Sequence, residues 1–182
     1  MKHYDIIIIG GGAAGFFTAI NAAEMDRHLK ILILERGKEV LTKVRISGGG
    51  RCNVTHAEFI PQELVKNYPR GEKELRGPFH SFMTGDTITW FEDHGIELKI
   101  EEDGRMFPVS DSSESIINCF LQATKKLKID ILKNQSVQNI EQVDAYWKIS
   151  TNKDQFSAEK ILLATGSNPK VWKMLEKLGH SI

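Results

Sequence analysis

The opening segment of the sequence constrains the fold more than any other part of the chain. An apolar run, Asp5–Ile9, leads directly into the glycine-rich stretch Gly10–Gly15. Four consecutive isoleucines in that run are typical of a strand that is buried on both faces of a parallel sheet. The Ala-rich stretch Phe16–Arg27 contains no Pro or Gly and predicts a helix. Lys30–Leu34 then predicts a second parallel strand, with Glu35 directly after it.

The glycines of this segment have the spacing of a dinucleotide-binding turn. Gly10, Gly12 and Gly15 allow a tight turn and a close approach of the backbone to a pyrophosphate, which the first amides of the following helix would hold. Glu35 is placed to accept hydrogen bonds from an adenosine ribose, and its charge would repel a 2′-phosphate. Such a glycine motif is common by itself, but here strand, helix, second strand and acid follow in the required order. The segment therefore predicts a dinucleotide site.

Composition limits the kinds of partner that the chain is expected to have. The 182 residues suggest one domain, and 24 basic and 24 acidic side chains give a net charge of zero. This balance predicts no nucleic acid and no anionic membrane as a partner. The apolar runs are too short to span a bilayer, and the start of the chain does not resemble a signal peptide, so we expect a cytoplasmic protein.

The two cysteines do not form a motif. Cys52 and Cys119 are far apart and no C-x-x-C pair occurs, so the sequence predicts neither a secreted disulfide framework nor the dithiol of flavin disulfide reductases. Cys52 and His56 as metal ligands would lack a second pair, and no metal site is predicted.

Three successive glycines interrupt the stretch Lys43–Thr55. Such a run suggests that the backbone passes close to a bulky group, and a flexible surface loop is the alternative. Lys43, Arg45 and Arg51 flank the glycines and favour an anionic partner. Cys52 within this stretch is either a redox-active thiol or a small residue packed against glycine backbone, and packing is the preferred interpretation.

The remaining sequence predicts an α/β fold with a parallel sheet and an antiparallel flap. The expected elements are a helical region over Pro61–Gly95 with a helix capped by Asp86, a strand over Ile96–Glu101, an irregular segment over Gly104–Asp111, a helix from Ser112 or Ser113 to Leu127, a third parallel strand over Ile129–Leu132, a meander made of Val137–Ile140, Trp147–Ser150 and Phe156, a buried strand over Ile161–Gly166 and a helix over Lys170–Leu178.

Four separated segments together resemble one protein family. They are Gly10–Gly15 with Glu35, ISGGGRCN at Ile46–Asn53, GRMFPVSD at Gly104–Asp111 and ATGSNP at Ala164–Pro169. This combination resembles the bacterial FAD-dependent oxidoreductases of the two-dinucleotide-binding-domain type, and specifically the family known as NAD(P)/FAD-dependent oxidoreductase, aminoacetone oxidase or 3-dehydro-bile-acid delta-4,6-reductase. The resemblance runs from Asp5 to Ile182. It implies a Rossmann-like FAD-binding fold with FAD as the cofactor.

The resemblance also implies which residues contact FAD. Those expected at the pyrophosphate and the ribose are Gly10, Gly12, Ala13, Ala14, Gly15, Glu35 and Arg36. Those expected beside the pyrophosphate, ribityl chain and flavin ring are Lys43, Ser47, Gly48, Gly49, Gly50, Arg51, Cys52 and Asn53. Val137 is expected to contact adenine through its backbone, and Ala164, Thr165 and Gly166 to lie beside the cofactor. Ser167 stands where many relatives have a glycine, and no catalytic residue is implied.

Members of this family are longer than this chain. The chain is therefore expected to be the N-terminal part, residues 1–182, of an FAD-binding domain, with a helical excursion at about 56–95, a β-meander at about 136–158, and no substrate-covering or C-terminal segments. The implied function is the FAD-binding portion of an oxidoreductase that acts on a small amine, ketone or enone, with NAD(P)H or O₂ as redox partner. By itself it is expected to be inactive. An NAD-binding dehydrogenase segment and a non-catalytic cofactor-binding remnant are the alternatives.

Overall fold

The computed structural model describes residues 1–181, which divide into two compact units. The first unit comprises Met1–Lys43 and Phe120–Ile182, and the second comprises Val44–Cys119. The two boundaries fall inside helices α2 (Thr42–Ile46) and α6 (Ser113–Lys126). Each unit contains its own sheet.

A six-stranded sheet forms the centre of the first unit. Its strands in spatial order are β6 (Asp130–Leu132), β2 (Ile31–Leu34), β1 (Lys2–Ile9), β9 (Gln155–Leu163), β8 (Tyr146–Thr151) and β7 (Val137–Val143). The pairs β6–β2, β2–β1 and β1–β9 are parallel, as predicted for the first three strands. Ile7 lies opposite Leu32 on one side and Ile161 on the other, and its side chain is fully buried. The isoleucine run is thus the middle of the sheet.

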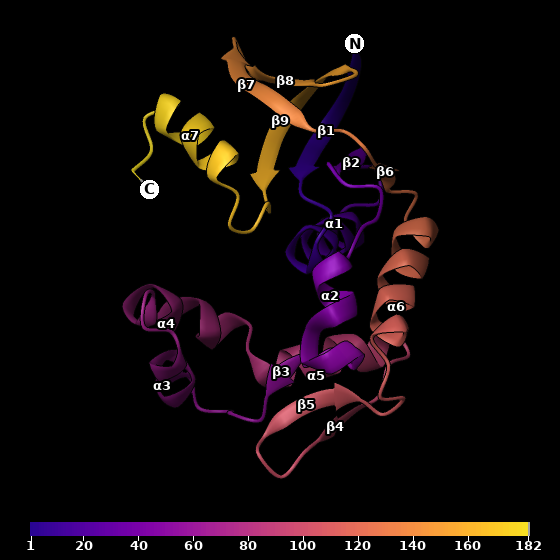
Figure 1. Ribbon diagram of the computed structural model, residues 1–182, viewed down its shortest axis with the longest axis vertical. Coiled ribbons are helices and arrows are strands. Elements are labelled where there is room, and N and C mark those ends of the chain that lie inside the picture. The colour runs from indigo at the N-terminus through magenta and orange to yellow at the C-terminus, as the bar shows by residue number, and fades with distance from the viewer. Residues whose placement is uncertain (182) are drawn as a thin grey trace. The chain divides into compact units, whose positions relative to one another are not determined.

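The end of the sheet that contains β7, β8 and β9 differs from the prediction in one respect. Phe156 was expected in a separate strand of the meander, apart from the parallel strand over Ile161–Gly166, but both belong to the continuous strand β9. β9 pairs antiparallel with β8 and parallel with β1, and Figure 1 shows β8 and β7 continuing the sheet beyond it. The polar residues Glu159 and Lys160 interrupt the apolar pattern inside β9 and made one strand resemble two.

The apolar core of this unit lies against the sheet. Helix α1 (Ala13–Met25) buries the stripe Phe16, Ala19, Ile20 and Ala23. The helix begins at Ala13, inside the glycine motif, rather than at Phe16 as expected, and it ends at Met25. The aromatic rings of Phe16 and Phe120 pack with centroids 5.9 Å apart. A second cluster includes Tyr4, Ile140, Ile149 and Phe156. Helix α7 (Pro169–Lys177) follows β9 and is capped by the Asn168 side chain.

The second unit contains a three-stranded antiparallel sheet in the order β3 (Thr55–His56), β5 (Arg105–Pro108), β4 (Leu98–Ile100). The segment Gly104–Asp111 was expected to be irregular, and this prediction was wrong for Arg105–Pro108, which forms the central strand. Gly104 before this strand and Pro108 at its end resemble loop residues, and its pairing with the distant β3 cannot be seen locally.

The helices of the second unit are short. They are the 3₁₀ segments η1 (Ser47–Gly50) and η2 (Val65–Asn67), and the α-helices α3 (Pro61–Leu64), α4 (Glu72–Ser81) and α5 (Thr84–Asp93). Asp86 was expected to be the N-cap of the last of these, but Met83 occupies that position. The Asp86 carboxylate instead lies one turn inside and accepts a hydrogen bond from the Met83 amide at 2.8 Å. Asp86 therefore stabilises the start of the helix from inside it, because its side chain accepts a hydrogen bond from the backbone amide of the N-cap residue.

The predicted fold class is confirmed. The structure is an α/β fold with a mostly parallel sheet and an antiparallel part, and α6 closely matches the helix expected from Ser112 or Ser113 to Leu127. Among residues 1–181, no helix combines the length and the apolar character needed to cross a membrane.

Candidate functional site

Two glycines of the first turn are required by the backbone itself. Gly10 has φ of 122°, and a Cβ there would collide with the Ala164 carbonyl oxygen, at the end of β9. A Cβ on Gly15 would collide with the Gly10 carbonyl oxygen. These contacts let the turn, the helix and β9 approach one another more closely than any side chain would allow.

Gly12 differs from these two glycines because it faces open space. A Cβ at this position would meet no atom within 4 Å, and its φ of −94° and ψ of −175° suit any residue. Gly12 is also the N-cap of α1, and no side chain caps the helix. The first amides of a helix have no partner within it and carry a partial positive charge, so the exposed start at Ala13 and Ala14 is suited to an anion.

Glu35 is oriented by two backbone amides on either side of it. Its Oε2 accepts a hydrogen bond from the Gly11 amide at 2.9 Å and its Oε1 accepts one from the Gly37 amide at 2.7 Å. A carboxylate has about four acceptor sites, so both oxygens can accept further donors such as ribose hydroxyls. The carboxylate is half-buried beside the glycine turn, while the neighbouring Arg36 is exposed.

The end of β9 and the start of α2 meet at the same turn. The Ala164 amide donates to the Ile9 carbonyl at 2.8 Å, and Gly166 has φ of 59°. The Lys43 Nζ lies 3.3 Å from the position that a Cβ on Gly166 would take. Lys43 is exposed, so its ammonium group adds a positive charge next to the Ala164–Gly166 turn.

The segment before β7 is anchored to Glu35. The Gln135 amide donates to the Glu35 carbonyl at 2.8 Å, and the Asn134 amide donates to the Gly37 carbonyl at 2.9 Å. Val137, half-buried at the start of β7, follows two residues later. The first unit thus places Gly10–Gly15, Glu35, Lys43, Val137 and Ala164–Gly166 around the carboxyl ends of β1, β2 and β9.

The second unit contains the triple-glycine loop, Ser47–Asn53. Gly48, Gly49 and Gly50 all have positive φ, and Cys52 has φ of 63°. A Cβ on Gly48 would lie 2.7 Å from both the Asn53 amide nitrogen and the Phe107 ring. The loop is closed by the Cys52 amide, which donates to the Ser47 carbonyl at 3.0 Å. The loop backbone therefore has a defined conformation held by its own contacts, and the flexible-loop alternative is not supported.

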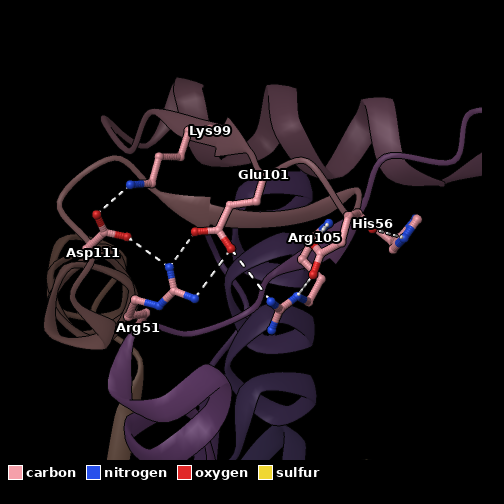
Figure 2. Close-up of polar contacts among 7 residues, drawn as sticks. Arg51, His56, Lys99, Glu101, Arg105 and Asp111 are labelled. Atoms are coloured by element: carbon pink, nitrogen blue, oxygen red, sulfur yellow. Dashed lines mark hydrogen bonds and ion pairs between the residues drawn. The ribbon is translucent and has the colours of Figure 1, made fainter.

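Two of the three cations expected to favour an anion are already paired within this unit. Arg45 forms an ion pair with Glu114, and Arg51 forms one with Glu101 and a second, at 3.4 Å, with Asp111. Figure 2 shows the Arg51 guanidinium pointing toward both carboxylates. Sequence reasoning missed Glu101, and it singled out the segment containing Asp111 without giving that residue a role.

Both thiols are buried. The Cys52 side chain is 6% exposed, and burial raises its pKa, partly offset by a hydrogen bond with Ser47. Burial also raises the pKa of Cys119 to about 11. A raised pKa leaves little thiolate at neutral pH, which favours the packing interpretation of Cys52. Among residues 1–181, no group of three or more metal-binding side chains comes together.

The family match agrees with this geometry. The family model of the HI0933-like protein Rossmann domain matches residues 4–182. The chain belongs to the HI0933-like Rossmann domain family. This is a family of FAD-binding flavoproteins, so the expected family, fold and cofactor are confirmed at that level.

Two relatives of known name are similar over nearly the whole chain. The ribosomal RNA dihydrouridine synthase of Escherichia coli K12 is 27% identical over 190 residues, covering 100% of this chain and 46% of the relative. The 3-dehydro-bile acid delta(4,6)-reductase of Clostridium scindens is 26% identical, covering 96% of this chain and 44% of the relative. The chain thus spans less than half the length of either relative.

A solved structure shows the same fold. The 3-ketosteroid-delta4-(5alpha)-dehydrogenase of Rhodococcus jostii RHA1 superposes with a TM-score of 0.66 and 15% identity, over 94% of this chain and 48% of that chain.

Proposed function

We propose that this chain is the FAD-binding portion of a flavin-dependent oxidoreductase, residues 1–182 of a longer FAD-binding domain. The observation that carries the proposal is the open start of α1 at Gly12, with Glu35 held by two amides beside it. A pyrophosphate fits the first feature, and an unphosphorylated adenosine ribose fits the second.

In this proposal each part of the first unit has one task. The amides of Ala13 and Ala14 bind the pyrophosphate, and Gly10 and Gly15 keep the turn close enough for them to reach it. Glu35 accepts hydrogen bonds from the ribose, with Arg36 next to it. Lys43 supplies a positive charge at the Ala164–Gly166 turn, and the Val137 backbone contacts adenine. For Ser47–Gly50, Cys52 and Asn53 the proposed contact with the cofactor rests on the family resemblance.

The proposed substrate is a small organic molecule with a carbon–carbon double bond conjugated to a carbonyl group. The names of both relatives support the conjugated double bond, since one forms dihydrouridine in ribosomal RNA and the other reduces delta(4,6) bonds of a 3-dehydro-bile acid. Only the second name supports a small molecule. FAD supplies hydride chemistry when it is bound and reduced. NAD(P)H is the proposed donor and O₂ the alternative redox partner. We propose further that this chain by itself does not turn over substrate.

A uracil base in RNA is the second candidate substrate, favoured by the name of the Escherichia coli relative. It contains the same kind of conjugated double bond. The net charge of zero gives the chain no basic surface excess of the kind that binds an RNA backbone, so we prefer the small molecule.

The experiment that tests the proposal is a competition among cofactors. The purified chain is titrated with FAD, FMN and NAD⁺, and any cofactor that copurifies is released by denaturation and identified by chromatography. FAD is expected to bind more tightly than FMN, because the described contacts serve the adenosine and pyrophosphate groups that FMN lacks. It is expected to bind more tightly than NAD⁺, because the family to which the chain belongs binds FAD. Binding of FMN alone would contradict the proposal. Preferential binding of NAD⁺ would favour the dehydrogenase alternative.

A further inference from the structure

Arg51 lies at the centre of a chain of alternating charges in the second unit. Lys99 pairs with Asp111, Asp111 with Arg51, and Arg51 with Glu101. The chain continues from Glu101 to Arg105 at 3.8 Å and from Arg105 to Asp103 at 2.7 Å. Figure 2 shows Lys99, Asp111, Arg51, Glu101 and Arg105 joined in series by dashed contacts. The guanidinium of Arg51 is thus placed between two carboxylates.

The same guanidinium lies on an aromatic ring that supports the glycine loop. The Arg51 Cζ is 3.9 Å from the centroid of the Phe107 ring, which is fully buried. The edge of this ring contacts Gly48, where a Cβ would come within 2.7 Å. The loop and β5 are also joined by the Val54 amide, which donates to the Met106 carbonyl at 2.9 Å. Arg51 therefore covers the ring against which the loop is folded.

The charge on Arg51 is already balanced where it lies. The fork of the guanidinium points two nitrogens at the two Glu101 oxygens, and one of those nitrogens also faces Asp111. Its side chain is 33% exposed and that of Glu101 is 28% exposed, so the pair is partly shielded from water. Forked pairing and stacking are specific to arginine, whereas a lysine could supply only a point charge. Both terminal nitrogens of the Arg51 fork are thus occupied by carboxylates of the chain itself.

We propose that Arg51 is a positioning residue that holds the loop Ser47–Asn53 in its folded conformation through Glu101 and Phe107, rather than a ligand of the anionic cofactor. The link between this loop and FAD rests on the proposed function, whereas the link between Arg51 and the loop conformation does not. The motifs SGGGRCN and GRMFPVSD then work as one structure, in which the second motif supports the first.

The first experiment measures the loop without any cofactor. Hydrogen exchange of the amides in residues 47–53 is compared among the wild-type chain, Arg51→Met, Arg51→Lys and Glu101→Gln. All three variants are expected to exchange about tenfold faster in this loop, because each removes the forked contact. Glu63→Gln breaks the exposed Lys66–Glu63 pair of the same unit and serves as the control, with loop exchange unchanged. Unchanged exchange in Arg51→Met and Glu101→Gln would overturn the proposal.

The second experiment distinguishes positioning from anion binding by whether Glu101→Gln weakens or tightens the binding of FAD. Removing the Glu101 charge would free Arg51 and tighten FAD binding if Arg51 were a phosphate ligand. Positioning predicts weaker FAD binding in Glu101→Gln, and an Arg51→Lys variant as weak as Arg51→Met. Tighter binding in Glu101→Gln, or wild-type affinity in Arg51→Lys, refutes positioning. Failure of the wild-type chain to bind FAD would refute the proposed function instead, and the exchange experiment would still decide the role of Arg51.

Discussion

Three glycines of one turn are needed for different physical reasons. Gly10 and Gly15 leave no space for a side chain beside backbone oxygens, whereas a Cβ on Gly12 would meet no atom within 4 Å. Replacing Gly10 by Ala should lower the free energy of unfolding by about 1–3 kcal/mol, because the new Cβ meets the Ala164 carbonyl at a φ of 122°.

Urea denaturation measures this change. Gly85→Ala is a suitable control because Gly85 lies in α5, where an added Cβ would have no atom within 4 Å, and it should raise stability by about 0.5–1 kcal/mol. Equal stability of the Gly10 variant and the wild-type chain would mean that the turn relaxes around the added methyl group.

The free energy of unfolding should fall in alkaline solution because of two buried groups, the Tyr4 phenol and the Cys119 thiol. Burial and the hydrogen bond to Asp130 raise the pKa of Tyr4 from 10.0 to about 12, and burial raises the pKa of Cys119 from 9.0 to about 11. The folded chain holds both protons more tightly than the unfolded chain does. The stabilising effect is therefore complete below pH 9 and is lost as the pH rises through 11 and 12.

Thermal melting from pH 8 to pH 11 should show this decline, and the double variant Tyr4→Phe, Cys119→Ala should show a shallower one. Lysines also titrate in this range, so the prediction concerns the difference in slope of melting temperature against pH between the wild-type chain and the double variant. Parallel melting curves against pH would show that neither group contributes.

At the scale of single elements, helix α5 depends on one carboxylate at its start. Asp86→Ala removes the hydrogen bond to the Met83 amide and should cost about 0.5–1 kcal/mol. Asp93 at the other end of the helix is the matched control, since an acid near the C-terminal carbonyls is unfavourable and Asp93→Ala should be neutral or slightly stabilising. Calorimetry of both variants checks the difference, and an equal cost at the two ends would argue against the capping contact.

Elements specified by local sequence were predictable, and those specified by distant pairing were not. The strand, glycine turn and helix from Lys2 to Met25 follow from residue type and spacing alone. β5 was missed because Gly104 and Pro108 resemble loop residues and because its pairing with the distant β3 gives no local signal. The same limit applies to the candidate site, where Glu35 could be placed from its spacing. The pairing of Arg51 with Glu101 depends on the tertiary structure and gave no signal in the sequence.

At the scale of the whole molecule, the proposed contacts to the adenosine half of FAD all lie in the first unit. That unit combines the two ends of the described chain into one sheet, so residues as distant as Gly10 and Ala164 come into contact. The relatives are more than twice as long as the share that this chain matches.

The central claim is that a pyrophosphate lies at the open start of α1, and Gly12→Val tests it most directly. The Cβ of valine would meet no atom within 4 Å and the backbone conformation suits any residue, so the chain should still fold, at the modest cost of valine at an N-cap, but the side chain would occupy the space of the phosphates. Calorimetric titration with FAD should show affinity reduced at least about tenfold relative to the wild-type chain. Gly85→Val, which adds the same side chain in α5, should bind as the wild-type chain does. Equal FAD affinity in all three proteins would contradict the account.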